Sequence, residues 1–88
     1  MGAPKHGLGG IDDHQRVAGS ILAAMATLEE LHALLTAAYP VQVTRPLRAC
    51  LDKLDEVRGL LRHELLHEQP LLSRNMLSAI YYPVREQA

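Results

Sequence analysis

The segment between residues 17 and 39 of this 88-residue chain has helical periodicity and carries almost no charge. Its only formal charges are Glu29 and Glu30. A surface helix normally has one polar face, so a helix that is apolar on nearly all sides must be covered on more than one side. The sequence therefore raises the question of what covers this helix.

Apolar residues in this segment recur at alternating spacings of four and three. The spacing predicts a helix over residues 13–38 whose buried stripe forms the seam of a left-handed bundle. Asp12 is the expected N-cap, with Gln15 completing a capping-box pattern, and Pro40 is expected to end the helix. The predicted stripe comprises Val17, Ile21, Ala24, Leu28, Leu31, Leu35 and Ala38.

A second helix is predicted to begin at Thr44 as its cap, with Pro46 in the first turn, and to end near residue 68 or 69. The short connection makes the two helices antiparallel neighbours. A third helix of about three turns is expected to start at Pro70 and to end before Pro83. The second stripe comprises Val43, Leu47, Cys50, Leu54, Val57 and Leu61, widened by Leu51 and Leu65.

These patterns predict an all-α fold, a long antiparallel helical hairpin with a short third helix that assembles into a helical bundle. We expect one helical domain over residues 12–82, between a flexible N-terminal tail, 1–11, and a C-terminal tail, 83–88. A domain this small buries only about 60% of its extended surface, so a partner interface would contribute strongly to its stability.

Composition excludes several function classes. The formal charge is −1, and no aromatic residues alternate with basic ones, so we expect no nucleic-acid partner. Glu29 and Glu30 lie near the middle of the apolar helix, where charge is costly in lipid, so we expect no membrane partner. Cys50 is predicted to be a small buried core residue, and a single cysteine fits a reducing, cytoplasmic compartment. The first ten residues lack the apolar segment of a signal peptide.

The face of the first helix opposite its predicted stripe is rich in small residues. Either the third helix folds back over it, or it packs on a second copy or another protein. The third helix spans less than half the length of the first, so we expect a homo-oligomer or a partner helix to bury the rest. An alternative is that alanine serves only as a helix former there. The predicted partner-binding residues are Gly19, Leu22, Ala23, Ala26, Leu34 and Ala37.

Residues 63–67, His-Glu-Leu-Leu-His, resemble the His-Glu-x-x-His motif of zinc proteases. The resemblance covers five residues and lacks the third ligand and the substrate-binding strand of those folds, so we predict no enzyme. The three residues from His63 also resemble the start of a histidine-kinase phosphorylation box, but the Arg-Thr-Pro that should follow is absent. Glu64 with His67 resembles half of a ferritin-like di-iron set without the facing carboxylate.

The helical wheel instead places His63 and His67 on the exposed or half-exposed side of their helix. Histidines at i and i+4 bind Zn²⁺ or another divalent transition metal when further ligands come from water or a partner chain. The alternative is a solvated histidine pair near a helix C-terminus. His14 is expected on the core stripe of the first helix, and one of Tyr81 and Tyr82 is expected to close the core.

The sequence therefore predicts a small non-enzymatic protein–protein interaction module, such as an adaptor, a chaperone-like protein or a regulatory subunit. It would act through the apolar second face of the first helix. The alternative function is a metal-binding helical protein that uses His63 and His67, across a dimer interface if two copies contribute ligands.

Overall fold

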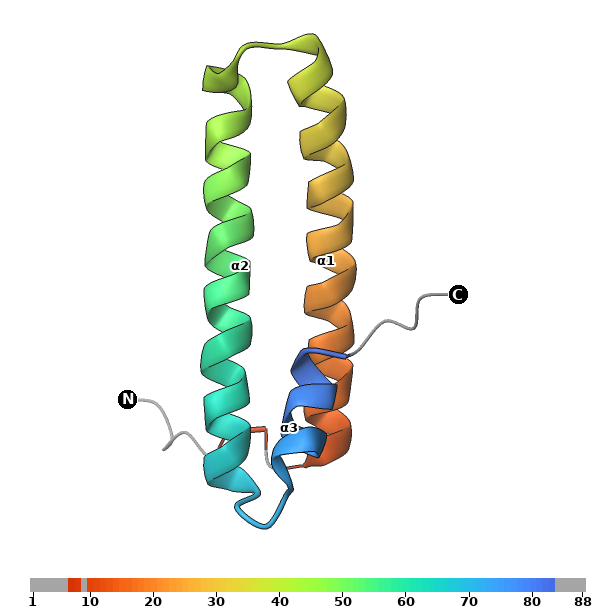
Figure 1. Ribbon diagram of the computed structural model, residues 1–88, viewed down its shortest axis with the longest axis vertical. Helices are drawn as coiled ribbons and strands as arrows, with labels where there is room; N and C mark the ends of the chain where they lie inside the picture. The colour runs from red at the N-terminus through yellow and green to blue at the C-terminus, as the bar shows by residue number, and fades with distance from the viewer. Residues whose placement is uncertain (1–6, 9, 84–88) are drawn as a thin grey trace, which may run out of the picture.

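The computed structural model describes residues 7, 8 and 10–83, and within them the chain forms three helices and no strand. Helix α1 spans Ile11–Ala38, α2 spans Val41–Glu68 and α3 spans Arg74–Tyr81. The two long helices run antiparallel, and α3 lies against the end of the hairpin where α1 begins and α2 ends (Figure 1). The predicted all-α hairpin with a short third helix is confirmed.

Helix α1 begins earlier than predicted, and its cap is different. Gly10 is the N-cap and makes no side-chain cap hydrogen bond. Asp12, the predicted cap, lies with Asp13 inside the first turn, where acidic side chains interact favourably with the positive end of the helix dipole. The capping-box prediction is therefore wrong, while the predicted end at residue 38, just before Tyr39 and Pro40, is confirmed.

Helix α2 also begins earlier than predicted, because Pro40 serves as its N-cap residue with φ −71° and ψ 164°. Thr44, the predicted cap, is buried within the first turns, and its hydroxyl donates to the Val41 carbonyl at 3.3 Å. The connection between the long helices is thus only Tyr39 and Pro40, which forces them into an antiparallel pair. The predicted end of α2 near residue 68 is confirmed.

Helix α3 is shorter than the sequence suggested. Its N-cap is Ser73, whose side chain accepts a hydrogen bond from the Met76 backbone N–H at 3.2 Å. Pro70 therefore does not start the helix, and Leu71 is 99% exposed. With eight residues, α3 is roughly 12 Å long and covers about a quarter to a third of the length of α1.

The seam between α1 and α2 is displaced by one position from the predicted stripes. Ile21, Leu28 and Leu35 are buried or half-buried as expected, whereas Ala24 and Leu31 are exposed. Cys50 is exposed as well, so its predicted place in the core is wrong. The observed seam residues of α1 are His14, Ala18, Ile21, Met25, Leu28, His32 and Leu35, and those of α2 are Thr44, Leu47, Leu51, Leu54, Arg58, Leu61, Leu65 and Glu68.

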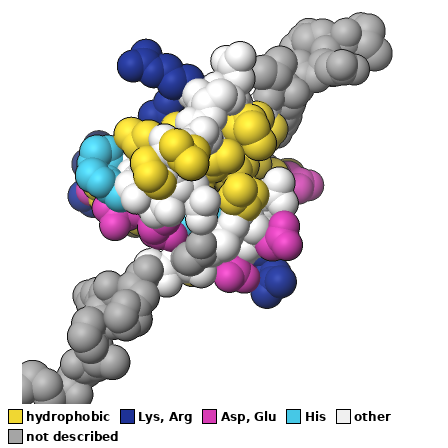
Figure 2. Space-filling model, turned by 90° about the horizontal axis from the view of Figure 1, so that it is seen from below, with side chains coloured by type: hydrophobic (Ala, Val, Ile, Leu, Met, Phe, Trp, Pro, Cys, Tyr) yellow, Lys and Arg dark blue, Asp and Glu magenta, His cyan; other side chains and the backbone are white. Residues whose placement is uncertain are grey.

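The position of α3 explains this displacement. The buried cluster joins Ala18 of α1, Leu65 of α2, and Leu77 and Tyr81 of α3. Each long helix must therefore turn toward both its partner and α3, which moves its buried arc toward the α3 side of the hairpin. Hydrophobic side chains gather over the end of the molecule where α3 lies (Figure 2).

By length and composition alone, α1 could cross a bilayer, because it has 28 residues and an 18-residue window of mean hydropathy 1.4. A core helix of a water-soluble protein meets the same two criteria, so this finding does not assign α1 to a membrane. The absence of a membrane partner and the cytoplasmic location remain predictions from the sequence.

Candidate interaction surface and polar sites

A buried polar cluster joins all three helices. The side chain of His14, from the first turn of α1, is fully buried, as predicted from its place on the core stripe. Its Nδ1 lies 2.6 Å from the Tyr81 hydroxyl of α3, and its Nε2 lies 2.9 Å from Oε1 of Glu68 at the end of α2. The His14 and Tyr81 rings meet edge to face, with centroids 5.7 Å apart. One imidazole thus ties α2 and α3 to the start of α1.

Hydrogen-bond roles in this cluster follow from the chemistry of the partners. The Glu68 carboxylate only accepts, so His14 Nε2–H donates to it. The roles of Nδ1 and the Tyr81 hydroxyl depend on the tautomer of His14, and with the ring proton on Nε2 alone the hydroxyl donates to Nδ1. Burial, with a smaller contribution from the Glu68 charge, raises the pKa of Tyr81 above its ordinary value. Because Tyr81 and His14 are both 0% exposed, a substrate cannot reach them, and the cluster fits a structural role.

Glu68 is the member of this cluster that the sequence reasoning missed. The structure places Glu68, the last residue of α2, beside His14. The available signal was the seven-residue repeat Leu47, Leu54, Leu61 and residue 68, which puts Glu68 on the seam. The prediction that one tyrosine closes the core is confirmed by Tyr81.

Two arginines of α2 hold the other side of α3. The Arg58 guanidinium lies 4.3 Å from the centroid of the Tyr82 ring and also pairs with Asp55. Arg62 donates to the Ser78 hydroxyl at 3.3 Å. Both arginines are half-buried, so their aliphatic stems pack while their charged groups fix the position of α3.

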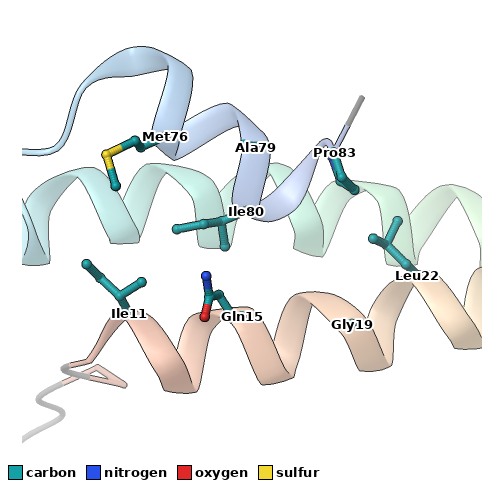
Figure 3. A pocket seen from close by; sticks show the side chains of 8 residues that line it. All are labelled: Ile11, Gln15, Gly19, Leu22, Met76, Ala79, Ile80 and Pro83. Carbon is teal, nitrogen blue, oxygen red and sulfur yellow. The ribbon is translucent and has the colours of Figure 1, made fainter. Parts of the chain in front are cut away.

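An apolar groove of about 470 Å³ lies between the start of α1 and α3. Met76 and Ile80 of α3 point toward Ile11 and Gln15 of α1 (Figure 3). Its lining residues are Ile11, Gln15, Gly19, Leu22, Met76, Ala79, Ile80 and Pro83, and none of them carries an ionisable side chain. The groove therefore offers shape and apolar contact but no group for acid–base chemistry.

The six predicted partner-binding residues divide into two groups. Gly19 and Leu22 line the groove beside α3. Ala23, Ala26, Leu34 and Ala37 are exposed, on the part of α1 beyond the short α3. Helix α3 thus covers the predicted face near the start of α1 and leaves the part of that face near the end of α1 accessible.

A larger apolar surface lies on the side of the hairpin opposite α3, which we call the back face. Ile11, Gln15 and Leu22 flank the α1 seam on the α3 side, so at about 100° per residue Val17, Ala24 and Leu31 flank it on the other side. On α2, Arg58 and Arg62 contact Tyr82 and Ser78 and so mark the side that faces α3. Val43, Cys50 and Val57 therefore lie on the other side of the seam. The back face comprises Val17, Ala24, Leu31, Val43, Cys50 and Val57, with Leu34 and Leu60 at its outer edges, where Leu34 also belongs to the small-residue face of α1.

Five large side chains of the back face are 41–66% exposed, namely Leu31, Leu34, Val43, Val57 and Leu60. Formal charges on this side occur at Asp13 and Glu64, at the end of the hairpin that holds α3, and at Lys53, which pairs with Glu56 at 3.5 Å. Between Val17 and Ala38 the back face of α1 carries no charge. An apolar surface of this extent, with few charges, is typical of a contact site.

His63 and His67 are both exposed on the outer side of α2, as predicted. Their Nε2 atoms lie 3.1 Å apart, and their ring centroids lie 4.7 Å apart. Figure 2 shows exposed imidazoles at the edge of the molecule, on the side of α2. No group of three or more His, Cys, Asp or Glu side chains suited to a metal ion occurs among the residues that the structure describes.

No protein-family model, curated protein or solved structure matches this chain. The function is therefore inferred from the geometry of the groove, the back face and the histidine pair.

Proposed function

We propose that this protein is a small non-enzymatic interaction module that packs the back face of its hairpin against an apolar helical partner, a second copy of the chain in the simplest case. The observation that carries this proposal is the group of five large apolar side chains, 41–66% exposed, on the α1–α2 side opposite α3. The buried polar cluster around His14 is closed to substrates, so no arrangement in the described residues favours catalysis over binding.

The size of the back face suits a stable association. Two helices of 28 residues are roughly 42 Å long, and two adjacent helices are about 15–20 Å wide. A face-to-face contact would therefore bury roughly 600–800 Å² on each partner, which is within the range of standard specific interfaces.

The repeat along the back face suits a helical partner. Val17, Ala24, Leu31 and Ala38 recur every seven residues on α1, as do Val43, Cys50 and Val57 on α2. These positions flank the intramolecular seam at a constant angle, so a second hairpin could extend the same packing into a four-helix bundle with crossing angles near 20°. A second copy brings the same uncharged stripe, so no unpaired charge becomes buried along most of α1.

Two neighbouring alanines provide a matched test. Ala24 lies on the back face and Ala23 on the outer, small-residue face predicted from the sequence, and both are exposed. We expect the wild-type chain to sediment as a dimer and Ala24→Glu to weaken association by roughly a hundredfold or more, because an unpaired buried charge costs about 3–5 kcal/mol. Ala23→Glu should associate like the wild type.

Sedimentation equilibrium at several concentrations, with circular dichroism to confirm that both variants stay helical, gives the answer. Disruption by Ala23→Glu alone would move the interface to the outer face of α1. A wild-type chain that stays monomeric at all concentrations would contradict self-association, and a partner of another sequence or a lipid surface would then be sought with the same two variants.

A further inference from the structure

We propose that His63 and His67 form a preorganised two-nitrogen site for a divalent transition-metal ion on the outer surface of α2. This site lies at the outer edge of the back face, because His67 follows Leu60 by seven residues and His63 follows it by three. The proposal does not depend on the interaction function.

The distance between the two nitrogens carries the proposal. Two imidazole nitrogens that bind one ion at about 2.1 Å lie about 3.0 Å apart at a right angle and about 3.4 Å apart at a tetrahedral angle. The observed Nε2–Nε2 distance of 3.1 Å falls between these values. The two nitrogens therefore already have the spacing that one shared ion requires.

The helix holds this geometry. Residues at i and i+4 lie one turn apart on the same face, so α2 fixes the spacing of the two side chains before any ligand arrives. Both positions lie in the last two turns of a helix that continues to Glu68. The ordering cost of binding is therefore small, and the second nitrogen acts as an intramolecular ligand.

Imidazole nitrogens favour Cu²⁺, Ni²⁺ and Zn²⁺ over Mg²⁺ and Ca²⁺, which prefer oxygen ligands. The described residues place no third His, Cys, Asp or Glu within a common ligand group here, so water would complete the coordination shell. The site is thus an open one, suited to exchange of the ion or to a further ligand from a second chain.

Without metal, the same 3.1 Å contact fits a hydrogen bond in which one imidazole donates and the other accepts. A chelating pair and two independent imidazoles differ in how metal affinity responds to loss of one ring. A chelating pair loses much of its affinity when either imidazole is removed, whereas independent imidazoles bind the ion separately and weakly.

The test is calorimetric titration of NiCl₂ or CuCl₂ into the full chain in a buffer that does not bind metal. We expect one tight ion per chain, or one per two chains if two copies share it. His67→Ala should lower the affinity roughly tenfold or more, because the second nitrogen of a chelate acts at high effective concentration. Both positions are exposed on a helix that alanine favours, so the fold should survive.

A rearranged variant controls for the number of imidazoles. His63→Ala with Glu56→His keeps all five histidines of the chain but separates the pair by eleven residues, roughly 16 Å along α2. We expect it to bind as weakly as His67→Ala, and Cu²⁺ electron paramagnetic resonance should show loss of one of two bound nitrogens. Equal affinity in the wild type and both variants would overturn the proposal.

Discussion

At the scale of single residues, a polar side chain occupies a core position that an apolar side chain would fill in most helical hairpins. His14 is fully buried, and each of its ring nitrogens has a partner on a different helix. Burying an imidazole without partners is costly, whereas a fully satisfied one fixes which groups meet around it. The cluster therefore selects one arrangement of α3 on the hairpin.

Tyr81→Phe tests the contribution of the phenol. The variant keeps the ring but leaves His14 Nδ1 without its hydrogen-bond partner, and the unsatisfied buried nitrogen should lower the free energy of unfolding by about 1–3 kcal/mol. Urea denaturation at pH 7, followed by circular dichroism, measures this change. An unaltered unfolding midpoint would show that the hydroxyl contributes nothing to stability.

The same phenol predicts a pH dependence on the alkaline side. The folded state raises the pKa of Tyr81, so above about pH 10 the unfolded chain releases this proton first and the folded state loses stability. The contribution is complete below pH 10 and falls as the pH rises toward the folded-state pKa. Denaturation curves between pH 8 and 11 should show a steeper decline in the wild type than in Tyr81→Phe, and parallel declines would contradict this assignment.

At the scale of elements, α3 depends on its surroundings. A helix of eight residues is unstable alone in water, so its formation requires the cap at Ser73 and docking onto α1 and α2. Leu77 and Tyr81 supply the apolar contact, and Arg58 and Arg62 supply polar contacts from α2. Docking of α3, the shortest helix, therefore sets how the two long helices are rotated about their axes.

Ser73→Ala tests the cap. Loss of the hydrogen bond from the Met76 N–H should lower the free energy of unfolding by about 1 kcal/mol, the usual cost of removing a serine cap. Ser20→Ala, at an exposed position inside α1, is the matched control and should leave stability nearly unchanged or slightly raised. Thermal denaturation of both variants measures the difference, and equal effects would contradict a specific capping role.

At the scale of the whole molecule, the uneven cover of the hairpin is the main feature. Helix α3 packs on one side of the hairpin near one end (Figure 1). The back face extends along both long helices. A third layer over the back face would complete the packing that the isolated chain leaves open.

Cys50 reports on that third layer, because it is exposed on the back face of a single chain. We expect a maleimide to modify Cys50 at the rate of an exposed thiol in dilute protein and more slowly as concentration rises and copies associate. In Ala24→Glu the rate should stay high at all concentrations. A rate that does not change with concentration, in samples that sedimentation shows to be dimeric, would place the interface elsewhere.

The sequence by itself determined the helical class, the break at Pro40, the end of α2 and the exposure of His63 and His67, since these depend on local propensity and on the position of proline. Only the tertiary structure decided which stripe is buried. The predicted and observed stripes of α1 share Ile21, Leu28 and Leu35, and three further predicted members are each next to an observed one: Val17 and Ala18, Ala24 and Met25, Leu31 and His32. The contacts of His14 with Tyr81 of α3 and with Glu68 of α2 chose between them, because they join residues 67 and 54 positions apart and leave no periodic signal in the sequence.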